Sequence, residues 1–197
     1  MAEQQPELAW IKLMTTGTIT REALHDRNIQ MRGFLRSDGL FEVEGRVTDR
    51  KSYAFRALLG DHDIPAGAPL HDMGVSLVFD ADLKVHAIET FTDAAPYSIC
   101  GAGGEALHAL TGLRMTSGWS AKVRERLAAH RSCVHLVQLL GPMATVAFQT
   151  LSVQRKQAVV DRDANGRPLK IDSCYAYGAE QSLVREKWPE HYEGPSA

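Results

Sequence analysis

The sequence has no excess of positive charge. Lys and Arg number 22 against 24 Asp and Glu, which gives a formal net charge of −2. Proteins that bind a nucleic-acid backbone displace its counterions with clustered cations, and a basic pair such as Arg155-Lys156 is too small for that role. We therefore expect no nucleic-acid partner.

Long apolar runs and paired cysteines are also missing. No run approaches the roughly 20 apolar residues that cross a bilayer, and the acidic start Met1–Glu7 lacks the layout of a secretory signal. The cysteines, Cys100, Cys133 and Cys174, are odd in number, which is typical of free thiols in a reducing compartment. We expect a cytoplasmic protein without a membrane partner.

Phosphate-binding glycine loops are the third absence. Gly101-Ala-Gly-Gly104 has neither the spacing nor the preceding parallel strand of a dinucleotide fingerprint. No Ser-His-Asp nucleophile elbow is found. We expect no nucleotide or flavin cofactor.

Two β-hairpins are present in the first half of the chain. Phe41, Val43 and Val47 alternate with polar residues, a period of two that indicates a strand with one buried face. The turn signal Ser37–Gly39 joins this strand to a preceding one at residues 28–34. A second hairpin is predicted from 73–79 through Asp80–Asp82 to 84–91.

Helical spacing replaces this alternation after Pro96. We predict a short helix at 105–110, a helix that Ser117 caps and that buries Trp119, and a helix from Cys133 to about Gln154 that Pro142 kinks or begins. The remaining elements are a turn at Asn165-Gly166, a strand at Ile171–Tyr177 and a weak helix at Ser182–Trp188.

Strands followed by helices indicate the α+β class. We predict a single domain over residues 1–197, with an antiparallel meander sheet of four or five strands covered by three or four helices. A loose arm spans 1–13, the sheet 28–92, the helices 104–155, and the C-terminal strand and helix 165–190.

Metal-binding side chains lie at the predicted ends of elements. They are His71 and Asp72 before the third strand, Cys100 before a helix, and Cys133 and His135 at the head of the long helix. Thiolate, imidazole and carboxylate suit Zn²⁺ or Fe²⁺, and three protein ligands leave a position open for water or substrate. The competing interpretation is a structural His–Asp pair beside buried, inert cysteines.

Two metal-free chemistries also remain open. Cys133 or Cys100, activated by His71 or His135, fits a thiol nucleophile at a helix start. Alternatively, Glu44 provides a general base, or Asp93 and Tyr97 act beside Cys100, with the Tyr97 phenol donating to an oxyanion. The commoner explanation for the polar residues near the first hairpin is a solvated face with cross-strand ion pairs. These residues are Arg36, Asp38, Glu42, Glu44, Asp49 and Lys51.

Several segments together resemble a bacterial family labelled as domain of unknown function 2889. The resemblance covers about residues 20–190 and supplies no settled reaction. It includes His71, Cys133, His135 and Cys174, and therefore favours a site built from them. The matching segments are Arg36–Gly45, Asp49–Tyr53, Leu70–Met73, Asp93–Tyr97, Cys133–Leu136, Leu140–Ala144 and Asp172–Ala176.

A fainter similarity links residues 70–150 to iron–sulfur scaffold proteins of the NifU and IscU type. In both, ligands precede a hairpin, follow it near a loop-to-helix turn, and recur at the head of a late helix. Here histidine replaces the first cysteine, Cys100 lies beyond the expected turn, and the last pair is separated and reversed. A mixed His/Cys/Asp set fits a retained single metal better than a transferred cluster.

These observations favour an enzyme, a lyase, isomerase or hydrolase, that acts on a small aromatic or acyl substrate. The expected metal ligands are His71, Cys133 and His135, with Asp72 or Cys100 as the fourth. An iron–sulfur or metal-handling protein and a non-catalytic small-ligand-binding module are the alternatives, and a homodimer is compatible with the sequence. We expect the pocket in the groove between sheet and helices, lined by Phe79, Phe91, Tyr97, Trp119 and Met143.

Overall fold

The computed structural model describes residues 20–56, 62–127, 130–153 and 162–195. The chain divides into two compact units, Met1–Leu151 and Ser152–Ala197. The arm predicted at residues 1–13 lies outside the described residues, and the prediction of a single domain stays a prediction.

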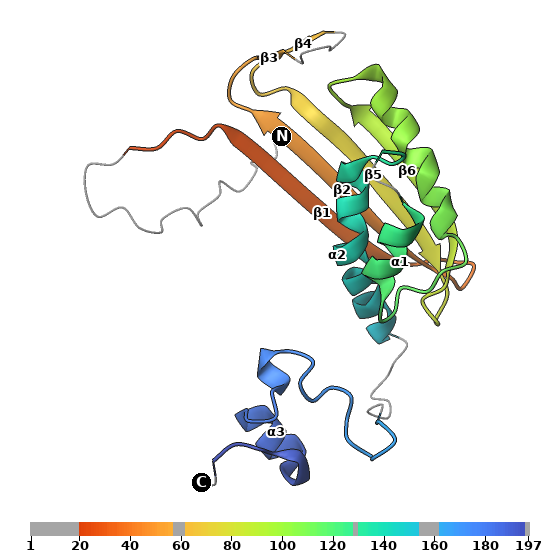
Figure 1. Ribbon diagram of the computed structural model, residues 1–197, viewed down its shortest axis with the longest axis vertical. Helices are drawn as coiled ribbons and strands as arrows, with labels where there is room; N and C mark the ends of the chain where they lie inside the picture. Colours follow the sequence, from red (N-terminus) through yellow and green to blue (C-terminus); the bar gives the residue numbers. More distant parts are fainter. Residues whose placement is uncertain (1–19, 57–61, 128–129, 154–161, 196–197) are drawn as a thin grey trace. The chain divides into compact units, whose positions relative to one another are not determined.

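The first unit is built on a four-stranded antiparallel sheet (Figure 1). Its strands are β1 (His25–Leu35), β2 (Phe41–Lys51), β5 (Pro69–Phe79) and β6 (Val85–Ala94), in the spatial order β1-β2-β5-β6. The predicted α+β class and the meander are confirmed. The sequence did not predict the small separate hairpin of β3 (Phe55–Arg56) and β4 (Asp63–Ile64), which lies between β2 and β5 in the chain.

Local chemistry explains both long hairpins. Gly39 adopts φ 83° and the Asp38 carboxylate accepts the Leu40 N–H, so the predicted turn between β1 and β2 forms. The Asp80 carboxylate accepts the N–H groups of Asp82 and Lys84 and shapes the turn between β5 and β6. Short polar side chains that bond nearby backbone favour turns over strand continuation.

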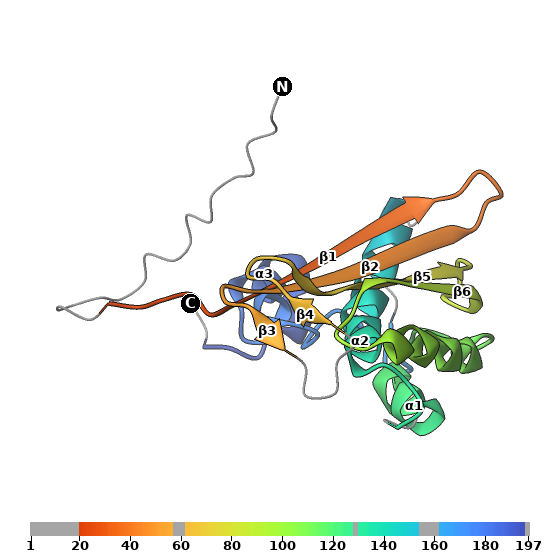
Figure 2. The same ribbon diagram turned by 90° about the horizontal axis from the view of Figure 1, so that it is seen from above.

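Helices lie on one face of this sheet, hereafter the inner face (Figures 1 and 2). The 3₁₀ helix η1 (Ser98–Leu110) packs along β6, and α2 (Val134–Thr150) crosses β1, β2 and β5 and continues into η2 (Leu151–Val153). Helix α1 (Trp119–Arg126) packs on α2 and η1. The core between sheet and α2 is fully buried and consists of Phe41, Val43, Val47, Met73, Val75, Leu77, Leu136, Leu139, Leu140, Met143 and Ala147.

Details of the helices differ from the prediction. The segment at 105–110 belongs to a longer 3₁₀ helix, and Pro142 lies inside α2 rather than at its start. Gly118, in the left-handed region at φ 83°, precedes α1, so the expected Ser117 cap is wrong. Glycine adopts this conformation without the strain that a Cβ brings, and it therefore replaces a side-chain cap here.

The second unit is small. The predicted turn at Asn165-Gly166 is present, with Gly166 at φ 80°. Helix α3 (Ser182–Lys187) confirms the weak terminal helix and is flanked by η3 (Tyr175–Tyr177) and η4 (Pro189–His191). A small core gathers Ile171, Ala179 and Val184, with Trp188 packed against it.

The strand predicted at Ile171–Tyr177 is wrong. Asp172 adopts φ 64°, and its carboxylate accepts the Ala179 N–H at 2.9 Å and pairs with Arg167. Local side-chain bonds to the backbone here replace a sheet ladder, as aspartate often allows.

Among the described residues, no helix combines the length and apolar character needed to cross a membrane.

Candidate metal centre

A polar row crosses the inner face at one end of the sheet. In the strand register, Arg27 of β1 lies opposite Asp49 of β2, and Asp49 lies opposite His71 of β5. Side chains that are directly opposite on antiparallel strands share a face and lie close together. Three strands thus place a cation, a carboxylate and an imidazole side by side.

Asp49 is the centre of this row. Its side chain is 1% exposed, and it accepts a bidentate pair from Arg27, with Nε–Oδ1 and Nη2–Oδ2 distances of 2.7 Å. His25 Nε2 lies 3.4 Å from Oδ1. A buried carboxylate needs such compensation because its charge has lost hydration. Arg27 is itself held by Gln138 of α2, at 3.1 Å from Nη1 to Oε1.

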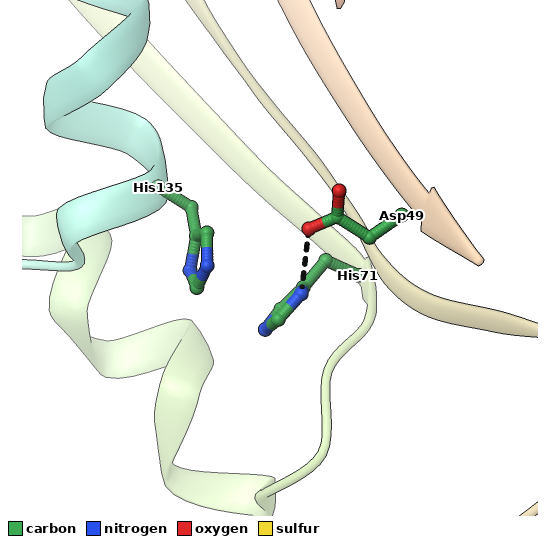
Figure 3. A group of neighbouring side chains, drawn as sticks. All are labelled: Asp49, His71 and His135. Carbon is green, nitrogen blue, oxygen red and sulfur yellow. Dashed lines mark hydrogen bonds and ion pairs between the residues drawn. The ribbon is translucent and has the colours of Figure 1, made fainter. Parts of the chain in front are cut away.

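His71 receives a fixed orientation from Asp49. Its Nδ1 lies 2.9 Å from Asp49 Oδ2. A carboxylate that is ionised only accepts, so Nδ1 carries the proton and Nε2 presents a lone pair. Figure 3 shows that this second ring nitrogen points away from Asp49.

His135 joins the two from the first turn of α2. Its ring centroid lies 3.9 Å from that of His71, at an interplanar angle of 37°. Asp49, His71 and His135 each offer a ligand atom, and these atoms all lie within 4.8 Å of one another (Figure 3). Two imidazoles and a carboxylate from three elements therefore converge at one point.

Cys133 lies next to this group. It precedes α2 as the N-cap residue, and its Sγ is 3.9 Å from His135 Nδ1 and 3.6 Å from Met73 Sδ. The Cys133 N–H donates to the Gly103 carbonyl, which ties the start of α2 to η1. A Cβ added to Gly103 would lie 2.9 Å from the Cys133 nitrogen, so a glycine permits this approach.

The electrostatics favour uncharged imidazoles and an ionised carboxylate. Burial lowers the pKa of His71, and its bond to Asp49 opposes this effect without reversing it. Burial also lowers the pKa of His135, and the charge of His71 lowers it further. Burial raises the pKa of Asp49, but Arg27 and His71 together outweigh burial and leave it below the usual value. A neutral imidazole is the form that binds a metal.

A pocket of about 460 Å³ opens onto the histidines. Tyr97, Cys100 and Cys133 line it beside His71 and His135. Its wall also includes exposed apolar side chains, with Ile99 at 78% and Val134 at 50% exposure. The pocket therefore joins polar groups at its floor to apolar surface at its mouth.

Five of the predicted site residues thus surround one pocket: His71, Tyr97, Cys100, Cys133 and His135. The structure does not bring Asp72, Asp93 or Glu44 to them. Asp72 follows His71 on β5 and points to the opposite, outer face, where Arg46 Nε lies 2.6 Å from its Oδ1. Asp93 lies 3.6 Å from the same arginine.

Glu44 also lies on the outer face, in the register position opposite Arg32 and Ser76. It is exposed, as is expected of a solvated sheet face.

The predicted groove between sheet and helices is filled by core. Phe79, Trp119 and Met143 are buried there, and the Trp119 indole donates to the Leu140 carbonyl at 2.9 Å. Phe91 lies on the outer face under Arg46. Of the residues expected to line a pocket, Tyr97 alone lines the pocket at the histidines.

The sequence prediction missed Asp49 and Arg27 as members of the site. Asp49 was grouped with the polar residues of the first hairpin, although it continues the alternation of Phe41, Val43 and Val47. This alternation could have identified Asp49 from the sequence, because it places the carboxylate on the buried face of the strand. Arg27 precedes the predicted strand, and nothing in its local sequence marked it.

The fold and the site define an α+β protein in which an antiparallel sheet and one helix bring a carboxylate and two histidines together, with the two histidines lining a pocket. The chain belongs to the family described as protein of unknown function (DUF2889), whose model matches residues 25–149. The match runs from the first residue of β1 almost to the end of α2 and includes Asp49, His71 and His135. The resemblance predicted from the sequence is confirmed over this range, and Asp172–Ala176 lies beyond it.

Comparison with curated proteins and with solved structures found no match. The similarity to iron–sulfur scaffold proteins therefore gains no support. Cys174, the third cysteine, is exposed in the second unit.

Proposed function

We propose that this protein binds one divalent transition metal, Zn²⁺ or Fe²⁺, and uses it to act on a small compound in the adjacent pocket. The observation that carries the proposal is the convergence of Asp49, His71 and His135, with ligand atoms within 4.8 Å of one another. Cys133 adds a soft donor 3.9 Å from His135.

His71 and His135 are the proposed ligands, and Cys133, whose Sγ lies 3.9 Å from His135 Nδ1 but outside the group of ligand atoms within 4.8 Å, is the proposed third. His71 presents Nε2 because Asp49 holds its Nδ1. Asp49 itself fits an orienting role better than a ligand role, since both its oxygens already accept from Arg27 and the guanidinium charge opposes a cation beside it. A carboxylate behind a ligating histidine fixes the ring and increases its basicity.

The pocket supports a small, largely apolar substrate with a carbonyl or phenol. Ile99 and Val134 offer apolar contact at its mouth. A metal with an open position polarises a carbonyl or lowers the pKa of bound water, and Tyr97 on the pocket wall supplies an O–H donor for a developing oxyanion. This chemistry corresponds to a lyase, isomerase or hydrolase.

Elemental analysis tests the metal. Protein purified without a metal-affinity tag should carry close to one equivalent of zinc or iron, and His71→Ala and His135→Ala should each lose it. Asp49→Asn should still bind the metal, with an affinity lower by about 10- to 100-fold. This is the usual loss when a residue that hydrogen-bonds to a metal ligand is replaced. Loss of metal in Asp49→Asn as complete as in His71→Ala would make Asp49 a direct ligand.

Two controls match these variants. His86 bonds Asp80 at 2.8 Å on the outside of the sheet, so His86→Ala removes a comparable His–Asp pair and should leave the metal in place. Cys174→Ser controls for Cys133→Ser. Wild-type protein that takes up no zinc or iron after reconstitution would contradict the proposal.

A cysteine nucleophile is the second candidate function. Cys133 lies at the start of α2, whose first turn has no acidic residue, and its Sγ is 3.9 Å from His135 Nδ1. A helix N-terminus favours negative charge, and cysteine attacks as its thiolate. This candidate predicts that iodoacetamide modifies Cys133 faster than Cys174, that His135→Ala slows the modification, and that added zinc does not protect it.

A further inference from the structure

Strand β1 has one free edge. It lies at the end of the sheet order and pairs only with β2 among the described residues. It is 11 residues long, contains no proline, and keeps an unbroken register with β2. Proteins usually protect long regular edge strands with bulges or prolines, because unpaired backbone groups recruit another strand. The inward charge of β1, Arg27, is neutralised by its pair with Asp49.

The backbone groups on this edge can be assigned. The Ser52 N–H donates to the Leu24 carbonyl and the Arg36 N–H to the Leu40 carbonyl, so even-numbered residues of this strand face β2. In an antiparallel pair these roles alternate. The N–H and C=O groups of the odd-numbered residues therefore point to the free edge: His25, Arg27, Ile29, Met31, Gly33 and Leu35.

Apolar side chains are exposed along the same strand and just before it. Leu24 is 55%, Ile29 48%, Phe34 40% and Leu35 56% exposed. Ile29 and Leu35 lie on the inner face and Leu24 and Phe34 on the outer face, so apolar side chains are exposed on both sides of this edge.

We propose that this edge binds β1 of a second copy of the chain, antiparallel and centred on Ile29. In that register Ile29 faces Ile29 of the second copy, and every odd residue faces an odd residue. The free backbone groups of both strands then bond each other. The two sheets become one continuous sheet.

Charge complementarity selects this register. Asp26 and Arg32 lie on the outer face of β1, opposite Arg50 and Glu44 of β2, and no ion pair within 4.0 Å involves either of them among the described residues. Centring on Ile29 places Asp26 of each copy opposite Arg32 of the other and places Leu24 opposite Phe34. A centre shifted by one residue, on Gln30, would place Asp26 opposite Phe34 and leave the charges unpaired. Opposite charges directly across a strand pair stabilise it.

The test is a charge exchange, read by sedimentation of the full chain over a range of concentrations. Wild type should form a concentration-dependent dimer. Asp26→Arg and Arg32→Asp should each weaken dimerisation by about tenfold, because each replaces two attractions with two repulsions. The double variant D26R/R32D should return to within about threefold of wild type. Glu89→Arg, a charge reversal on the exposed face of the other edge strand β6, should have no effect.

Hydrogen exchange provides a second readout that needs no variant. Raising the protein concentration should slow exchange at the amides of Arg27, Ile29 and Met31, while those of the even residues, already bonded to β2, stay unchanged. A monomer at all concentrations, or a dimer that neither single variant weakens, would overturn the proposal. A double variant as weak as the singles would also overturn it. Odd-residue amides that are protected in a monomer would show that another part of the same chain covers the edge.

Discussion

The sheet carries two bidentate arginine–aspartate pairs of similar geometry on opposite faces, one between β1 and β2 and one between β2 and β5. On the inner face Arg27 holds Asp49, and on the outer face Arg46 holds Asp72, with N–O distances of 2.6–2.7 Å in both. The Asp49 side chain is 1% exposed and that of Asp72 13%, and the Arg27 side chain is 34% exposed and that of Arg46 49%. Burial is therefore the main difference between them.

That difference decides what each pair can do. Water competes for the outer pair, and Arg46 also contacts Asp93 and the ring of Phe91. The inner pair lies beside His71 and His135, where a charge acts through less water and therefore more strongly. The same two residue types serve as surface electrostatics on one face and as the support of a binding site on the other.

The largest effect should come from breaking the inner pair. Asp49→Asn leaves Arg27 without its counter-ion and should lower the free energy of unfolding by about 3 kcal/mol. This value is at the lower end of the cost of removing one partner from a buried ion pair, because Arg27 is partly exposed and can be hydrated again. Urea unfolding of metal-free protein measures the change. A loss below about 1 kcal/mol would show that the inner pair is no stronger than the outer one.

The histidines of the inner face should make the free energy of unfolding depend on pH, an effect of intermediate size. Folded His71 and His135 have pKa values below the ordinary value of about 6.5, so the unfolded chain binds more protons as the pH falls below that value. The free energy of unfolding should then fall with decreasing pH, by at most about 1.4 kcal/mol per pH unit for each histidine. Burial is the main cause of both lowered pKa values. Arg27 lowers both further and Asp49 raises both, while His25 lowers the pKa of His71 and His71 lowers that of His135.

Thermal or urea unfolding between about pH 7 and pH 5, with a chelator present, measures this slope. His135→Gln keeps a polar side chain of similar length and should flatten the slope. An unchanged slope in this variant would place the acid sensitivity elsewhere in the chain.

The smallest effect should follow from breaking the outer pair. Asp72→Asn should lower the free energy of unfolding by less than about 1 kcal/mol, since the pair is partly solvated. At about 1 M salt, where charges are screened within about 3 Å, the difference from wild type should disappear. An effect of Asp72→Asn equal to that of Asp49→Asn would refute the comparison between the two faces.

Much of the first unit could be predicted because its signals are local. The alternation of Phe41, Val43 and Val47 and the turns at Asp38-Gly39 and Asp80 determine the hairpins. We predicted from their positions at the ends of elements that three side chains would converge: His71, Cys133 and His135. The structure places all three around one pocket.

The remaining parts depend on information that is not local. Asp72 is next to His71 in sequence, but neighbours on a strand point to opposite faces, so proximity along the chain was misleading. Arg27 reaches Asp49 only through strand pairing over 22 positions. Whether the space beneath α2 is open or filled depends on side-chain packing, such as that of Met143 against Gly45, where an added Cβ would lie 2.8 Å from Sδ.

The strand register that builds the site also has a consequence for folding. Asp49 meets Arg27 and His71 only when β1, β2 and β5 pair as they do. A slip of one residue between β1 and β2 moves the side chains of β1 to the other face, which would remove Arg27 and leave the Asp49 carboxylate buried without its cation. A shifted register is thereby destabilised at the same position where the native register brings the histidines together. The polar row therefore stabilises the native strand register relative to shifted ones. The register that it favours is also the one that assembles the site.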